Sequence, residues 1–128
     1  MAKTRSELRE KIMIILYQWD LFKGKVSIDE IIKGNLEIEN DFVKDVVYGV
    51  VTHQSEIDEL ANKFMTDWSI DRLDKTGAAI LRMGVFEIKY TDTPEIVVIN
   101  EAIELAKKYS DDSVRKIINA VLDKVIKE

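Results

Sequence analysis

The sequence contains no cysteine, one proline and one histidine. The lack of cysteine excludes disulfides and thiolate metal sites. With one proline and five glycines in 128 residues, few positions interrupt long regular elements. No hydrophobic run approaches the roughly 20 residues that a membrane span needs, and the N-terminus lacks the apolar segment of a secretory signal. These absences favour a cytosolic protein.

The chain also lacks an excess of positive charge. Its formal net charge is −5, which argues against a protein that binds polyanions non-specifically. Both ends are nevertheless basic: residues 1–13 contain four basic and two acidic residues, and residues 105–128 contain six and four. If the ends meet in the fold, they could form a local phosphate-binding patch. The simpler alternative is lysines scattered for solubility, and composition alone favours it.

The apolar residues are spaced as in an all-α protein. They make up 46% of the sequence, which is enough for a core, and the length suits one domain of residues 1–128. Spacings of three and four residues recur along the chain, and no segment alternates with the period of a strand. We therefore expect a bundle of about seven helices. The predicted helical segments are 5–23, 28–34, 42–64, 75–90, 97–109 and 114–125.

Local signals refine these boundaries. Thr4 and Glu7 have the spacing of a capping box, and Pro94 is expected at the first position of its helix. The segment 42–64 fits one long helix, or two helices if Thr52 to Ser55 break it. Gly49 within that segment suggests the close approach of another backbone.

The sequence offers no catalytic constellation. His53 is spaced as a core or boundary residue, and no Gly-rich loop follows a strand. The acidic pair Asp111 and Asp112 is explained by capping at a helix start rather than by a metal. We expect neither an enzyme nor a bound metal or cofactor. Five aromatic residues have the spacing of core positions: Trp19, Phe64, Trp68, Phe86 and Tyr109.

The polar side of the last predicted helix, unlike these residues, also allows a functional interpretation. Arg115 and Lys116 lie four and three residues before Asn119, which places all three away from the apolar stripe. A solvated face would need no further explanation. An RNA-binding face would use the cations for phosphates and the amide for a base or sugar.

Several ordered motifs resemble the NusB (N-utilization substance B) family. The resemblance runs from about Arg5 to Leu122, and several motifs in order are far more specific than any one alone. The matching segments are Leu16-Tyr17-Gln18, Ala79-Ile80-Leu81-Arg82 with Phe86-Glu87, Ile99 to Tyr109 (INEAIELAKKY), and Ile117 to Leu122 (IINAVL).

The resemblance implies two packed helical subdomains and a function in transcription antitermination. Such a protein binds the single-stranded boxA element of nascent RNA with NusE, a small-subunit ribosomal protein, and helps RNA polymerase pass terminators, notably on ribosomal RNA operons. The residues at the family's RNA-binding positions are Lys3, Arg5, Arg9, Lys107, Asp112, Lys116 and Asn119. Those at its NusE-binding positions are Tyr17, Leu21, Asp74, Arg82 and Glu87.

The sequence departs from the family pattern in three places. Ser6, Glu7 and Leu8 interrupt the arginine-rich start. Gly77-Ala78 replaces an acidic-basic pair, which puts polar NusE contacts there in doubt, and Ala120 replaces a glycine. Two alternatives also remain open: an RNA-positioning module related to rRNA cytosine methyltransferases, whose catalytic domain would have to follow Glu128, and a protein-interaction bundle without RNA binding.

Two mutational expectations follow from the sequence. Replacing Arg5 and Arg9 with alanine is expected to weaken RNA binding with little change in thermal stability. Asn119→Ala is expected to reduce RNA selectivity more than stability, unless the side chain is buried at a helix junction.

Overall fold

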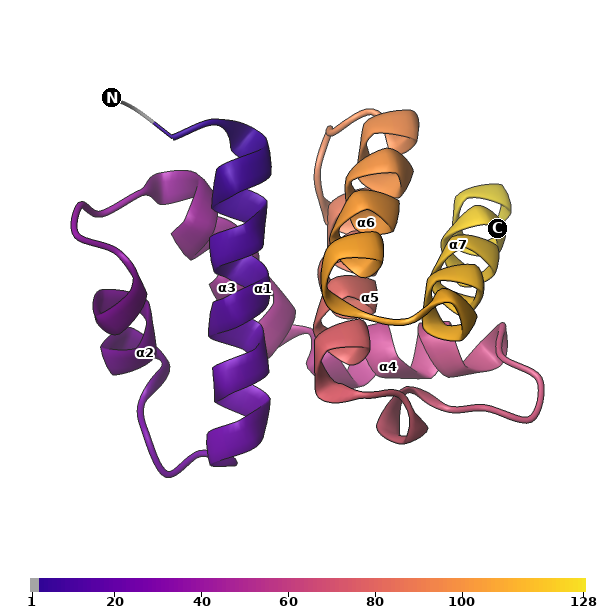
Figure 1. Ribbon diagram of the computed structural model, residues 1–128, viewed down its shortest axis with the longest axis horizontal. Coiled ribbons are helices and arrows are strands. Elements are labelled where there is room, and N and C mark those ends of the chain that lie inside the picture. Colours follow the sequence, from indigo (N-terminus) through magenta and orange to yellow (C-terminus); the bar gives the residue numbers. More distant parts are fainter. Residues whose placement is uncertain (1–2) are drawn as a thin grey trace.

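The computed structural model describes residues 3–128, and within them it forms two groups of helices packed side by side (Figure 1). The first group is α1 to α3 and the second is α4 to α7, so the expected all-α fold with two subdomains is confirmed. The elements are α1 (Arg5–Phe22), α2 (Ile28–Asn35), α3 (Asp41–Thr52), α4 (Gln54–Lys63), the short 3-10 helix η1 (Ile70–Arg72), α5 (Lys75–Tyr90), α6 (Glu95–Tyr109) and α7 (Asp112–Lys127).

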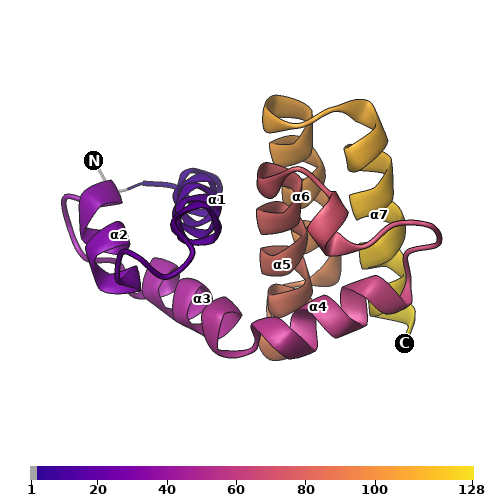
Figure 2. The ribbon, with the colours of Figure 1, turned by 90° about the horizontal axis from the view of Figure 1, so that it is seen from below.

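Helix α5 lies at the centre and belongs to the core of both groups. It packs against α1 and α3 on one side and against α4, α6 and α7 on the other (Figure 2). Every residue from Gly77 to Glu87 is buried. This agrees with the two apolar faces expected for this helix, because a helix that is apolar all round must be covered on every side.

The helix ends follow local side-chain chemistry. Thr4 and Glu7 form the expected capping box at the start of α1. The segment 42–64 is two helices, with His53 as the residue between α3 and α4. Pro94 is the N-cap of α6 rather than its first residue, so α6 begins at Glu95, two residues earlier than expected.

Gly49 in α3 does allow a close approach, but by a side chain and not by another backbone. A methyl group at this position would meet the ring of Phe86 from α5. That ring stacks on Tyr90, which in turn stacks on His53 at the α3–α4 junction. The missing Cβ of Gly49 therefore makes room for an aromatic stack between the two groups of helices.

Two of the five aromatic residues expected in the core are in fact exposed. Phe86 is buried, and Trp19 and Phe64 pack against the core, but Trp68 is 44% exposed and Tyr109 is 38% exposed. Trp68 lies in the loop before η1, where the Arg72 guanidinium is 5.1 Å from its ring centroid. Tyr109 is the last residue of α6. An amphipathic ring at such a place keeps one side in water.

Candidate RNA-binding surface

Two exposed cations lie at the start of α1: Lys3, just before the helix, and Arg5, its first residue. The Arg5 guanidinium lies 3.9 Å from the centroid of the Phe42 ring. Lys3 borders a groove with the loop between α2 and α3. Both side chains are exposed, as a phosphate contact requires, but they point toward the α3 side and not toward α6.

The outer face of α7 holds the second part of the predicted site. Val114, Ile118 and Val121 face the core, so Lys116 and Asn119 face solvent. The expected orientation of Asn119 away from the core is confirmed. Lys116 forms no ion pair with any residue of the segment 3–128, whereas Arg115 pairs with Asp112 at 3.3 Å. Ala120 is also exposed, so its methyl group crowds no helix contact.

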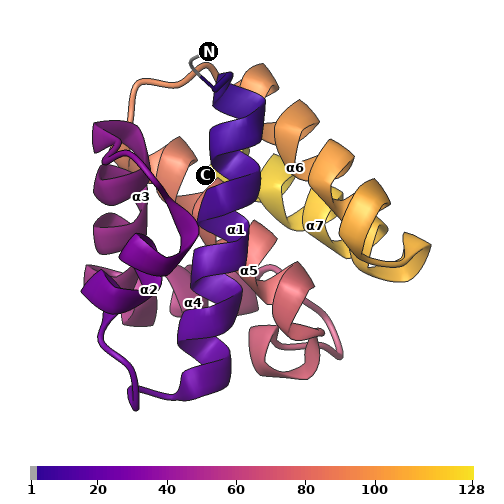
Figure 3. The same ribbon diagram turned by 60° about the vertical axis from the view of Figure 1, so that its left-hand side comes forward.

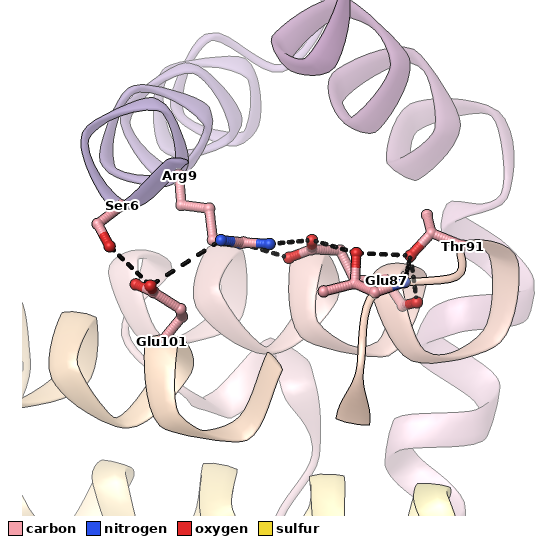
Figure 4. A network of polar contacts seen from close by, with 6 residues as sticks. Ser6, Arg9, Glu87, Thr91 and Glu101 are labelled. Atoms are coloured by element: carbon pink, nitrogen blue, oxygen red, sulfur yellow. Dashed lines mark hydrogen bonds and ion pairs between the residues drawn. The ribbon is translucent and has the colours of Figure 1, made fainter. Parts of the chain in front are cut away.

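Arg9 occupies a different environment from Arg5, although the resemblance implies that both contact RNA. Its side chain is 5% exposed and donates two hydrogen bonds to Glu87 of α5, at 3.0 and 2.8 Å. Figure 4 shows this pair, with Glu101 of α6 3.9 Å from the Arg9 guanidinium. The residue therefore joins the two groups of helices and is not part of an accessible surface.

The environment of Arg9 keeps the guanidinium charged despite its burial. Burial alone disfavours the charge, but the hydrogen bonds and the charge of Glu87, together with the charge of Glu101, outweigh it and raise the pKa of Arg9. The Thr93 hydroxyl also lies 3.4 Å from the Glu87 carboxylate. A buried charge so completely paired is costly to disturb, which contradicts the expectation that its loss would leave stability unchanged.

The predicted NusE-binding residues also include both accessible and buried side chains. Tyr17 is half-buried and Leu21 is exposed in the last turns of α1. Asp74 is exposed as well, but its carboxylate caps α5 by accepting a hydrogen bond from the Gly77 N–H at 3.0 Å. Ser110 donates a further hydrogen bond to it at 3.2 Å. The cap of α5 therefore involves Gly77, which is one of the positions where the sequence departs from the family pattern.

Arg82 and Glu87 were expected on the partner surface, but both side chains are buried. Arg82 donates to both carboxylate oxygens of Asp58 in α4, at 2.8 and 3.0 Å. A third helix joins this pair, since Asp20 of α1 lies 3.6 Å from the Arg82 guanidinium. In this structure the two residues hold helices together and offer little accessible area to a partner.

The two basic ends of the chain do meet, but their charges partly cancel where they do so. Figure 3 shows the start of α1 beside α6. At this junction the Ser6 hydroxyl donates to Glu101 at 2.6 Å, and Glu10 accepts hydrogen bonds from Lys108 and Tyr109. Sequence reasoning missed Glu10, Lys108 and Tyr109, because only the fold brings residues so far apart in the chain together.

The described residues contain no helix that is both long and apolar enough to span a membrane. Across the same residues 3–128, no group of three or more histidine and acidic side chains is arranged to hold a metal ion.

Comparisons with known proteins identify the relatives of this chain. The NusB family model matches residues 6–127. The transcription antitermination protein NusB of Macrococcus caseolyticus is 39% identical, with 97% of each chain covered. The NusB protein of Listeria innocua is 41% identical over the same shares of both chains.

Solved structures show the same similarity in three dimensions. T. maritima NusB has a TM-score of 0.88 and 29% identity, with 100% of this chain and 94% of that chain covered. A second structure, of the antitermination factors NusB and NusE in complex with dsRNA, has a TM-score of 0.84 and 32% identity, with 99% and 98% covered. From its sequence and its arrangement of helices, this chain belongs to the NusB family.

Proposed function

We propose that this protein is a transcription antitermination factor that binds boxA-type, single-stranded RNA together with NusE. In this role it joins the antitermination complex of RNA polymerase and helps the polymerase read through terminators, notably on ribosomal RNA operons. It acts in the cytoplasm, where nascent RNA is made. NusB proteins are antitermination factors and not enzymes, in agreement with the expectation from the sequence.

One observation carries the proposal: a protein 32% identical over 99% of this chain has been seen in complex with both NusE and dsRNA. The relatives are also matched over 97% of their own length, which favours this function over that of an RNA-positioning module in a methyltransferase.

The exposed residues suit the task. Lys3, Arg5, Lys107 and Lys116 supply cations for phosphate oxygens, and Asn119 supplies an amide that both donates and accepts hydrogen bonds. Unpaired bases present their edges to such an amide, which is the reason for proposing single-stranded RNA as the ligand. Asp112, at the first position of α7, is the one acidic residue in the set. Its pairing with Arg115 leaves Lys116 as the unpaired cation of that turn.

The proposed NusE surface is smaller than the sequence suggested. Its accessible members are Tyr17, Leu21 and Asp74, and the exposed Phe22 follows Leu21 at the end of α1. Exposed apolar side chains on a helix end are typical of a protein interface, because burying them against a partner removes apolar area from water.

The proposal is tested by titrating the protein with a boxA-like RNA and with a scrambled RNA of equal length, each with and without NusE. We expect tighter binding of the boxA-like RNA, a further gain with NusE, and affinity that falls as salt rises. Equal affinity for the two RNAs in both conditions would contradict the proposal.

Replacing Lys116 with alanine is expected to weaken binding of both RNAs by roughly threefold or more at low salt, because one phosphate contact is lost. The dependence of log affinity on log salt should become shallower by about 0.7 for a single strand. The matched control is Lys124→Ala, another exposed lysine two turns further along α7. Equal losses in the two variants would remove Lys116 from the site.

Asn119→Ala is expected to narrow the affinity ratio between the boxA-like and the scrambled RNA. The amide reads a base edge, whereas the neighbouring cations attract any sequence. Since the side chain is exposed, the melting temperature should stay within about a degree of the parent value. A large fall in melting temperature with an unchanged ratio would assign Asn119 a structural role instead.

A further inference from the structure

At the junction between α1 and the end of α6, the Glu10 carboxylate binds two side chains that could otherwise contact RNA. Glu10 accepts hydrogen bonds from Lys108 on both of its oxygens, at 3.0 and 3.3 Å, and a further one from the Tyr109 hydroxyl. The Lys108 ammonium is 5.3 Å from the centroid of the Tyr109 ring. A carboxylate that gathers an ammonium and a phenol in this way makes the contacts that a phosphate group would make.

The surroundings of this cluster are open and acidic. A groove of about 550 Å³ runs between α1 and α6, and its lining includes Lys107 and Lys108. It also includes four carboxylates: Glu7, Glu10, Glu101 and Glu104. Lys107 pairs with Glu104 at 3.6 Å, so both lysines of the groove already have an acidic neighbour. Four carboxylates against two lysines give the groove a net negative charge, which disfavours RNA, although Lys107 is among the cations proposed to bind it.

The hydrogen bonds from Tyr109 and Lys108 hold the pKa of Glu10 below its usual value, so this carboxylate is charged at neutral pH. The pair is nevertheless open to solvent, since the side chains of Lys108 and Glu10 are 61% and 31% exposed. Water and salt screen such a pair, which makes it weak. A phosphate group can therefore displace the Glu10 carboxylate at small cost.

We propose that Glu10 competes with RNA for Lys108 and Tyr109 and thereby limits the affinity of the RNA surface. When the carboxylate is displaced, Lys108 contacts a phosphate and the Tyr109 ring becomes a platform for a base. This inference rests on the proposed RNA-binding function and adds to it a residue that weakens binding rather than strengthening it.

Glu10→Gln tests this inference. The variant keeps the shape of the side chain but loses the charge that holds Lys108, so we expect RNA affinity to rise by roughly threefold or more at low salt. The dependence of log affinity on log salt should steepen by about 0.7, the value for one added contact to single-stranded RNA.

Glu7→Gln is the matched control, because it removes the same charge from the same groove and helix. Glu7 holds the capping box at Thr4 and no lysine, and glutamine can replace glutamate in such a box. Its gain in affinity should be smaller than that of Glu10→Gln. Equal gains would mean that only the general charge of the groove matters, and would overturn the inference.

The role of Lys108 is tested by adding Lys108→Met to each background. The loss of RNA affinity should be larger in Glu10→Gln than in the parent protein, since only there is the ammonium free. Equal losses in the two backgrounds would overturn the inference while leaving the proposed function intact. If neither the parent nor Glu10→Gln bound RNA, both the inference and the proposed function would fail.

Discussion

Replacing Arg9 with alanine is expected to lower the free energy of unfolding by about 3–5 kcal/mol, because the buried Glu87 carboxylate is left without its partner. The two hydrogen bonds at 2.8 and 3.0 Å cross from α1 to α5, so the substitution weakens the contact between the two groups of helices. Chemical denaturation followed by circular dichroism measures the change, with the slope against denaturant checked for two-state behaviour.

Arg5→Ala is the control for this experiment, since it removes the same side chain one turn earlier on the same helix. Arg5 is exposed and its guanidinium lies over the Phe42 ring, so its loss should cost less than about 1 kcal/mol. The double variant Arg9→Met with Glu87→Leu should recover most of the stability, because an apolar pair leaves no buried charge unpaired. Similar losses for Arg9→Ala and Arg5→Ala would show that the buried pair contributes nothing.

Gly49→Ala is expected to destabilise the protein by about 1–3 kcal/mol, although alanine is the better helix former. The new methyl group meets the ring of Phe86, and that ring cannot move without disturbing its stack with Tyr90. Thermal and denaturant unfolding both report the loss.

Gly34 provides the opposite case in the same protein. It lies in helix α2, and a methyl group there would have nothing within 4 Å. Gly34→Ala should therefore stabilise the protein by up to about 1 kcal/mol. In a Phe86→Leu background, which shortens the obstructing side chain, the cost of Gly49→Ala should fall. If Gly49→Ala stabilised the protein as Gly34→Ala does, the contact with Phe86 would carry no energetic weight.

The fold could be predicted from the sequence because the signals for each helix lie within or next to its own residues and recur from helix to helix. Each helix shows its apolar stripe within its own residues, and caps such as Thr4 mark where helices start. The outward direction of Asn119 followed from the stripe of α7 alone. The division of 42–64 into α3 and α4 could not be decided, because the apolar stripe continues through His53 and only packing against α5 shows the bend.

The candidate site was harder to predict because it depends on partners that are distant in the chain. Arg5 and Arg9 are one turn apart, and the basic composition of this segment does not distinguish an exposed arginine from a buried one. Only Arg9 pairs with Glu87, which is 78 positions away in the sequence, and this pair is buried between two helices. One signal was available: Arg9 lies three and four residues before the buried Ile12 and Met13, on the apolar face of α1. A charge on such a face requires a buried partner.

The central position of α5 also matters while the chain is being made. The ribosome adds roughly 5–20 residues per second, so some seconds pass between the synthesis of α1 and that of α5. During that interval α1 and α3 have no partner for the apolar faces that later cover α5. The emergence of residues 75–90 covers these faces, but the opposite side of α5 stays exposed to chaperones and to aggregation until α6 and α7 follow.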